Sequence, residues 1–276
     1  MAKTYPIVLA HGISRFDALA NRLFQIDNQD RDDGLHYFRN IRTHLQGRGF
    51  VVRHSHVEWA RGVDVRAGTL KSEIGRFLVE LGAEKVHIIA HSMGGLDARH
   101  MLYNSRDEGF HRKVASLTTL GTPHHGSPVA DFLVKNVGRV VSKFGLPIEG
   151  ARDLTTQACA AFNEKADGWE SDCGVRFRTY AGAQSVLHIF TPLKAAWAII
   201  HPVEGDNDGL VSTRSAKWKD EYFVEPVLEA DPLNLLGWWN VSELAHGVMP
   251  AELESRIKAV YLAIASELAE EFPLPS

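Results

Sequence analysis

The stretch that decides the fold is Val86-His87-Ile88-Ile89-Ala90-His91-Ser92-Met93-Gly94-Gly95-Leu96. Its apolar run predicts a buried strand, its glycines predict a sharp turn, and the residues from Leu96 onward predict a helix. A serine at the apex of such a turn has an exposed hydroxyl, and the backbone N–H of Met93 then lies at a helix N-terminus, where negative charge is favoured. The pattern A-x-S-x-G therefore predicts a nucleophilic Ser92; a glycine-rich turn without chemistry is the alternative.

Small residues are required around such a turn because the strand and the helix pass close to each other. Ala90 and Gly94 meet this requirement, although glycine is more common at the first of the two positions. We therefore expect close backbone contact on both sides of Ser92.

Composition limits the classes of partner and the number of domains. The 276 residues predict a single domain, residues 1–276, with a substantial core. A net charge of −4 without a basic block argues against nucleic acid and against an anionic membrane surface. No signal-peptide pattern and no apolar run of membrane-spanning length is present, which predicts a cytoplasmic protein, or a secreted one whose signal peptide is absent from this chain. Cys159 and Cys173 are expected to be reduced.

Strand and helix patterns alternate along the chain. Strands are predicted at 5–10, 50–57, 86–91, 114–120 and 175–181, and helices at 35–45, at 64–81 with Asp64 as N-cap, and at the C-terminal end. Such alternation predicts an α/β fold with a mostly parallel central sheet and helices on both faces.

The first predicted strand ends in His11-Gly12-Ile13. Ligands of open α/β sheets bind at the carboxyl ends of the strands, so this tripeptide should lie close to Ser92. The backbone N–H groups of Ile13 and Met93 would then form an oxyanion hole, and Gly12 would permit close approach. We expect the His11 side chain to brace this loop.

A serine nucleophile needs a base, and the base needs an acid that orients it. Where a nucleophilic serine stands on such a strand-to-helix turn, the order along the chain is serine, acid, histidine. His246 is the only histidine after the acidic turn Asp206-Asn207-Asp208-Gly209, so it is the predicted base. Asp208 is favoured as the acid because it directly precedes an apolar pair, whereas Asp206 is expected to cap the turn.

The paired His124 and His125 could suggest a metal site. No carboxylate or cysteine stands at ligand spacing around them, so we expect no metal there.

The chain resembles the bacterial triacylglycerol lipase family, the true lipases of the α/β-hydrolase superfamily, over nearly its whole length. The matching segments are YPIVLAHGI, VHIIAHSMGGLDARHM, VASLTTLGTPHHGSPVADF, RDLTTQACAAFN and NDGLVSTRSAKW. The resemblance implies an α/β-hydrolase fold, fatty-acid esters as substrates, Ser92 as nucleophile, Asp208 as acid, and the amides of Ile13 and Met93 as oxyanion hole. His246 is supported less directly, because an extra segment, 222–236, precedes it. An esterase, thioesterase or acyltransferase on the same triad is the alternative, and a binding module without catalysis is another.

The chain departs from the family at two positions. Many secreted members hold a calcium ion partly through an aspartate two residues beyond the catalytic histidine, where this chain has Val248. They also place a disulfide cysteine just after the acid, where this chain has Arg214. We therefore expect catalysis without a cofactor and without calcium.

Residues 128–147 predict an amphipathic helix whose apolar stripe includes Phe132, Val137 and Val141. The resembling family carries its mobile lid in this segment, which implies a helical lid or cap insertion at about 128–172 and transient contact with a lipid–water interface. Ordinary packing of the helix against the protein is the alternative.

Overall fold

The central sheet has five parallel strands in the order β2-β1-β3-β4-β5. They are β1 (Ile7–Ala10), β2 (Val52–His54), β3 (Val86–His91), β4 (Val114–Leu120) and β5 (Arg176–Tyr180). The computed structural model describes residues 3–13, 32–58, 61–136 and 148–275. The predicted parallel sheet is confirmed.

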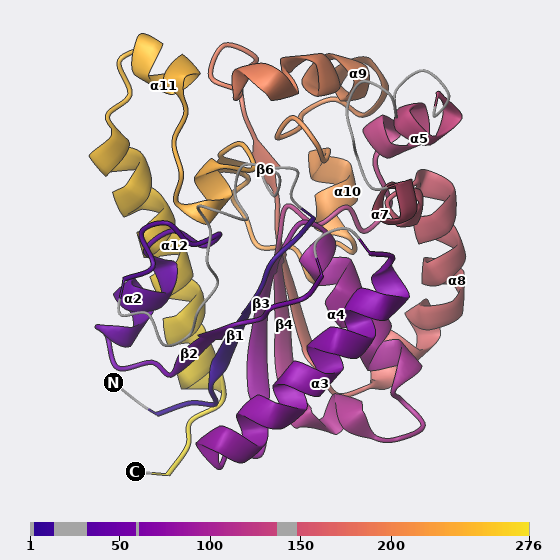
Figure 1. The fold of residues 1–276 in the computed structure, drawn as a ribbon, viewed down its shortest axis with the longest axis vertical. Helices are drawn as coiled ribbons and strands as arrows, with labels where there is room; N and C mark the ends of the chain where they lie inside the picture. Colours follow the sequence, from indigo (N-terminus) through magenta and orange to yellow (C-terminus); the bar gives the residue numbers. More distant parts are fainter. Residues whose placement is uncertain (1–2, 14–31, 59–60, 137–147, 276) are drawn as a thin grey trace.

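Helices cover both faces of the sheet (Figure 1). Helices α2 (Ile41–Gln46) and α12 (Pro250–Glu271) pack on one face with Ile7 and Leu9 of β1. Helices α3 (Val63–Leu81) and α4 (Met93–Asn104) pack on the other face with Val8 and Ala10. Because alternate side chains of a strand point to opposite faces, the apolar run of each strand supplies both layers of the core.

Two local predictions about helices were wrong. The helix expected at 35–45 begins only at Ile41, because Asn40 has a left-handed backbone (φ 57°) that ends the preceding turns. The N-cap of α3 is Gly62 rather than Asp64. The oxygen that the cap would have supplied comes from Asp153, whose Oδ2 accepts a hydrogen bond from the Val63 N–H at 2.7 Å.

Three helices lie within the predicted insertion 128–172: α5 (Pro128–Lys135), α7 (Ile148–Asp153) and α8 (Thr156–Asp172). The described part of the predicted lid helix ends at Lys135, with Asn136 as C-cap. Val137, Val141 and the rest of that stripe lie outside the described residues.

Further elements follow β5 and extend beyond the carboxyl ends of the strands. They are β6 (Gly182–Ala183), α9 (Lys194–Glu204), α10 (Thr213–Lys217), β7 (Leu228–Glu229) and α11 (Val241–Ala245). Helices α5, α9 and α11 form the upper edge of the molecule in Figure 1. Strands β6 and β7 pair in parallel, so the extra segment 222–236 contributes a strand beside the end of β5. None of the described helices is long and apolar enough to cross a membrane.

Candidate active site

Ser92 lies between the end of β3 and the start of α4, at the apex of the predicted turn. Its backbone has φ 53° and ψ −131°, a conformation that strains any residue with a side chain. Its N–H donates to the carbonyl of Leu120 at 3.0 Å, and its carbonyl accepts from Thr122 Oγ1 at 2.8 Å. Bonds from β4 and from the loop after it therefore hold Ser92 in this conformation.

The helix after Ser92 passes very close to the first strand. A Cβ atom at Gly94 would lie 2.5 Å from the carbonyl oxygen of Ala10, so only glycine fits there. The predicted need for a small residue is confirmed at this position. The Ser92 side chain is half-buried, and no described residue forms a hydrogen bond with its hydroxyl, which leaves that hydroxyl available to a base.

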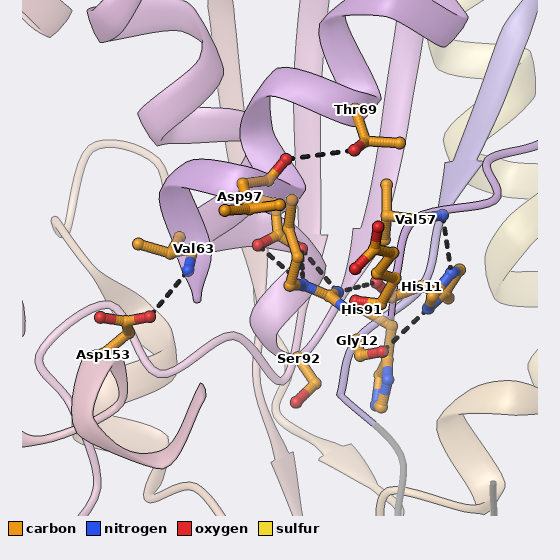
Figure 2. Close-up of polar contacts among 12 residues, drawn as sticks. His11, Gly12, Val57, Val63, Thr69, His91, Ser92, Asp97 and Asp153 are labelled. Carbon is orange, nitrogen blue, oxygen red and sulfur yellow. Dashed lines mark hydrogen bonds and ion pairs between the residues drawn. The ribbon is translucent and has the colours of Figure 1, made fainter. Parts of the chain in front are cut away.

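The loop after β1 lies directly against Ser92 (Figure 2). A Cβ atom at Gly12 would lie 2.8 Å from Ser92 Cβ. The Gly12 N–H donates to Tyr37 Oη at 3.2 Å, whereas the Ile13 N–H donates to no described residue. The Met93 N–H belongs to the first turn of α4, where helix amides have no acceptor within the helix. The structure thus brings the two predicted oxyanion donors together beside Ser92.

Helix α7 covers the side chains of these two donors. A Cβ atom at Gly150 would lie 2.5 Å from Ile13 Cδ1 and 3.7 Å from Met93 Sδ. Ile13 and Met93 belong to one apolar cluster with Cys159 of α8. Cys159 and Cys173 are free thiols, and burial raises the pKa of Cys159 to about 12. Part of the predicted cap is therefore packed onto Ile13 and Met93.

Asp208 lies in a buried turn between α9 and α10. Its Oδ1 accepts hydrogen bonds from the N–H groups of Leu210 and Val211, both at 2.8 Å, and its Oδ2 faces Gly121 at the end of β4. Burial raises the pKa of Asp208 to about 7, and the nearby carboxylate of Asp231 adds to this rise. Asp206, the alternative acid, is exposed to solvent.

His246 lies apart from the other predicted catalytic groups. It is the exposed C-cap residue of α11, its Nδ1 is 2.6 Å from the Ser242 carbonyl oxygen, and its ring contacts the ring of His188 at 5.1 Å. None of the hydrogen bonds between described residues joins His246 to Asp208 or to Ser92. The structure therefore places Ser92 beside the two predicted oxyanion donors and leaves the predicted base without a hydrogen bond to either Ser92 or Asp208.

His124 and His125 have other partners. His124 is buried, with Nε2 2.9 Å from Thr119 Oγ1 and its ring stacked on Trp218. His125 Nε2 lies 2.8 Å from the Trp218 carbonyl oxygen. Among the described residues, no three histidine, cysteine, aspartate or glutamate side chains form a group that could hold a metal ion.

Comparison with known proteins identifies the family. A family model described as a PGAP1-like alpha/beta domain matches residues 78–145. Triacylglycerol lipase 2 of Saccharomyces cerevisiae is 28% identical, with 85% of this chain and 81% of that protein covered. A triacylglycerol lipase of Vibrio cholerae is 30% identical, with 76% of this chain and 73% of that protein covered. The chain belongs to the triacylglycerol lipase family.

Solved structures support the same fold. The metagenomic carboxyl esterase MGS0156 superimposes with a TM-score of 0.74 at 16% identity, covering 99% of this chain and 77% of the esterase. The mature Bacillus licheniformis lipase BlEst2 gives a TM-score of 0.64 at 20% identity, covering 83% of this chain and 85% of that lipase. The predicted α/β-hydrolase fold is confirmed, and this lipase-family chain is a serine hydrolase that acts on esters.

Sequence reasoning missed a buried ion pair beneath the oxyanion loop of this lipase-family chain. Arg66 of α3 donates to both carboxylate oxygens of Asp97 in α4, and its Nη2 also donates to the His11 carbonyl at 3.0 Å. Burial raises the pKa of Asp97 to about 6, while Arg66 opposes this rise. The signal was present, since Arg66 stands on the buried stripe of α3 between Val63 and Leu70.

A separate cavity of about 670 Å³ lies between α8 and α10. Residues on its wall include Thr156 and Ala160 of α8, Arg214 and Lys217 of α10, and His125. None of the predicted catalytic residues lines it, so it is not the space in which Ser92 would meet an ester.

Proposed function

We propose that the protein hydrolyses fatty-acid esters through Ser92, His246 and Asp208, with an acyl-enzyme intermediate. The observation that carries this proposal is the strained Ser92, which holds a free hydroxyl beside the unused N–H groups of Ile13 and Met93. Such an arrangement suits attack on an ester carbonyl, because the two amides stabilise the oxyanion that forms. The lipase names of the relatives support a fatty acyl group as the substrate.

The reaction has two halves. Ser92 Oγ attacks the ester carbonyl carbon while His246 takes the hydroxyl proton, and the resulting tetrahedral oxyanion accepts hydrogen bonds from Ile13 and Met93. Collapse of this intermediate expels the alcohol, which receives the proton from His246, and leaves the acyl group on Ser92. Water activated by His246 then attacks the acyl-enzyme, releasing the fatty acid and restoring the serine hydroxyl.

His246 must change position for this mechanism. Its Nδ1 now lies 2.6 Å from the Ser242 carbonyl oxygen, and in the reactive state it would donate to Asp208 instead. Gly247, with φ +82°, follows immediately and is exposed, so the chain can turn there without steric cost. We therefore assign to residues 246–249 the movement that completes the triad.

Two assays test the proposed function. A fluorophosphonate probe should label the wild type at Ser92 and should leave Ser92→Ala unlabelled. p-Nitrophenyl esters of short to long acyl chains, run beside emulsified triglyceride, should show hydrolysis by the wild type and a loss of up to roughly a million-fold in Ser92→Ala. An unlabelled, inactive wild type would favour a binding module, and activity confined to short soluble esters would favour an esterase.

We also propose that catalysis needs no calcium. Many secreted members of the family that the chain resembles have an aspartate at this position, where the side chain of Val248 offers no oxygen ligand. Calcium requires several oxygen ligands. EDTA should leave the rate of ester hydrolysis unchanged. A complete loss that added calcium reverses would refute this proposal.

A further inference from the structure

The orientation of one peptide group decides whether the proposed oxyanion hole works. We infer that His11 is a positioning residue of that hole: its imidazole fixes the Gly12–Ile13 peptide so that the Ile13 N–H points toward the ester oxygen. This inference rests on the proposed function. It goes beyond the bracing of a loop, because it predicts that the His11 side chain, which touches no substrate, affects kcat through the direction of the Ile13 N–H.

Two hydrogen bonds fix which nitrogen of His11 carries the proton. The Val57 N–H donates toward His11 Nε2 at 3.3 Å, so Nε2 is the acceptor. Burial, with a smaller effect of the Arg66 guanidinium, lowers the pKa of His11 to about 3, so the ring is neutral at neutral pH. The proton therefore stays on Nδ1, which donates to the Gly12 carbonyl oxygen at 2.9 Å (Figure 2).

This bond sets the direction of the neighbouring N–H. The Gly12–Ile13 peptide is trans, and the C=O and N–H groups of a trans peptide point in opposite directions. With the Gly12 carbonyl turned toward the His11 ring, the Ile13 N–H is turned away from it. Gly12 itself abuts Ser92, and the Ile13 N–H has no acceptor among the described residues, so this N–H is available to the oxygen of an ester bound at the serine.

Two further bonds hold the preceding peptide group, between His11 and Gly12. The Gly12 N–H donates to Tyr37 Oη, which is also hydrogen-bonded to Nδ1 of His91, the residue before Ser92, at 2.7 Å. The His11 carbonyl accepts from Arg66, whose Nε and Nη2 also donate to buried Asp97 in the helix after Ser92. Both bonds tie this peptide to the turn that carries Ser92, and the His11 ring holds the next one, Gly12–Ile13, through its carbonyl oxygen.

A purely structural role for His11 would affect stability and leave catalysis intact. His87 provides the matched control, since it is also fully buried and also makes two ring hydrogen bonds, to Thr4 Oγ1 and Ser116 Oγ. It lies on β3 five residues before Ser92, near the opposite end of the strand. His87→Leu should therefore lower the thermal midpoint while kcat stays at the wild-type value.

The experiment compares His11→Leu, His11→Asn and His87→Leu with the wild type, using p-nitrophenyl butyrate as substrate and butylboronic acid as a mimic of the tetrahedral adduct. His11→Leu should lower kcat by roughly 100-fold, the loss typical of one missing oxyanion donor, with little change in KM. The affinity for the boronic acid should fall by a similar factor. His11→Asn, whose Nδ2 can replace the Nδ1 donor, should recover most of both losses.

Three results would overturn the inference: a folded His11→Leu variant with wild-type kcat, a His11→Asn variant as impaired as His11→Leu, or equal loss of kcat in His87→Leu. If His11→Leu does not fold, His11→Phe, which keeps a ring but has no Nδ1 donor, replaces it, with the same loss of kcat and the same unchanged KM expected. An active wild type with unaffected variants refutes only this inference. A wild type that neither hydrolyses the ester nor reacts with the fluorophosphonate probe refutes the proposed function itself.

Discussion

The turn that carries Ser92 and the helix that carries His246 lie at the same end of the molecule and differ in how they are held. Ser92 is fixed by β4, by the loop after it and by the crowded approach of Gly12 and Gly94. His246 is exposed, its side-chain hydrogen bond is to Ser242 of its own helix, and its ring contacts only that of His188 among the described residues. Ser92 and the proposed oxyanion donors are thus held by the central sheet and the loops next to it, whereas the proposed base, His246, lies at the surface.

Helix α11 is nevertheless firmly attached at its beginning. Asn240 caps it by accepting from the N–H groups of Ser242 and Glu243, and its Nδ2 donates to the buried carboxylate of Asp231. The opposite end, with His246 and Gly247, has no comparable attachment among the described residues. This difference is the reason that the proposed movement, which would complete the triad, is assigned to residues 246–249 and not to the start of the helix.

Replacing the base tests this comparison most strongly. His246→Ala should reduce hydrolysis almost as much as loss of Ser92, up to roughly a million-fold, because triad members act as a unit. His188→Ala is the control, since His188 contacts the His246 ring and has no assigned chemical role. Ester hydrolysis by both variants measures the difference. Retention of most activity in His246→Ala would place the base elsewhere, with His124 and His125 the next residues to test.

The two aspartates of the acidic turn should differ in effect. Asp208→Asn should lower kcat by about 10⁴-fold, because an amide cannot hold the histidine in the required tautomer. Asp206→Asn should have little effect, since Asp206 is exposed and has no described side-chain hydrogen bond. Equal losses of kcat in the two variants would leave the acid unassigned.

Asp208→Asn should also stabilise the folded protein at alkaline pH. Burial raises the pKa of Asp208 to about 7 from its ordinary value of 3.8, so the folded state binds a proton more tightly than the unfolded state. The stability contributed by this proton is fully present below the unfolded pKa and is lost as pH rises through the folded pKa. Asp208→Asn should therefore raise the thermal midpoint at pH 8 by a few degrees, which corresponds to a gain of about 1 kcal/mol in the free energy of unfolding. At pH 4 the midpoint should stay nearly unchanged. Thermal unfolding at both values checks this expectation, and a gain that is as large at pH 4 would contradict it.

The parts of the site that the sequence predicted are those with local patterns. The apolar run before Ser92 predicts a strand, and the glycines after Ser92 predict a sharp turn. The tripeptide that begins at His11 likewise predicts a loop from a few neighbouring residues. The bonds that hold the oxyanion loop join residues that are far apart along the chain, 25 positions for Gly12 and Tyr37 and 55 for His11 and Arg66. No local pattern reports such pairs, and the exposed position of His246 likewise depends on where α11 packs.

The smallest effect on activity is expected from a substitution in helix α5. Phe132 of α5 is 47% exposed, while the same helix is held by Asp131, whose carboxylate accepts from the N–H and the hydroxyl of Thr156. An exposed aromatic side chain at this edge of the molecule can enter a lipid–water interface, where burial of apolar surface is favourable.

Phe132→Asp should therefore lower the rate on emulsified triglyceride several-fold and leave hydrolysis of a short soluble ester unchanged. Val79→Asp is the matched control, because Val79 is 84% exposed on α3, near the end of that helix farthest from Ser92, and its replacement should alter neither rate. Wild-type activity on a sparingly soluble ester should also rise sharply once the substrate passes its solubility limit. If Phe132→Asp lowers both rates equally and the wild-type curve passes smoothly through that limit, α5 is ordinary packing, and contact with the interface must come from another part of this edge.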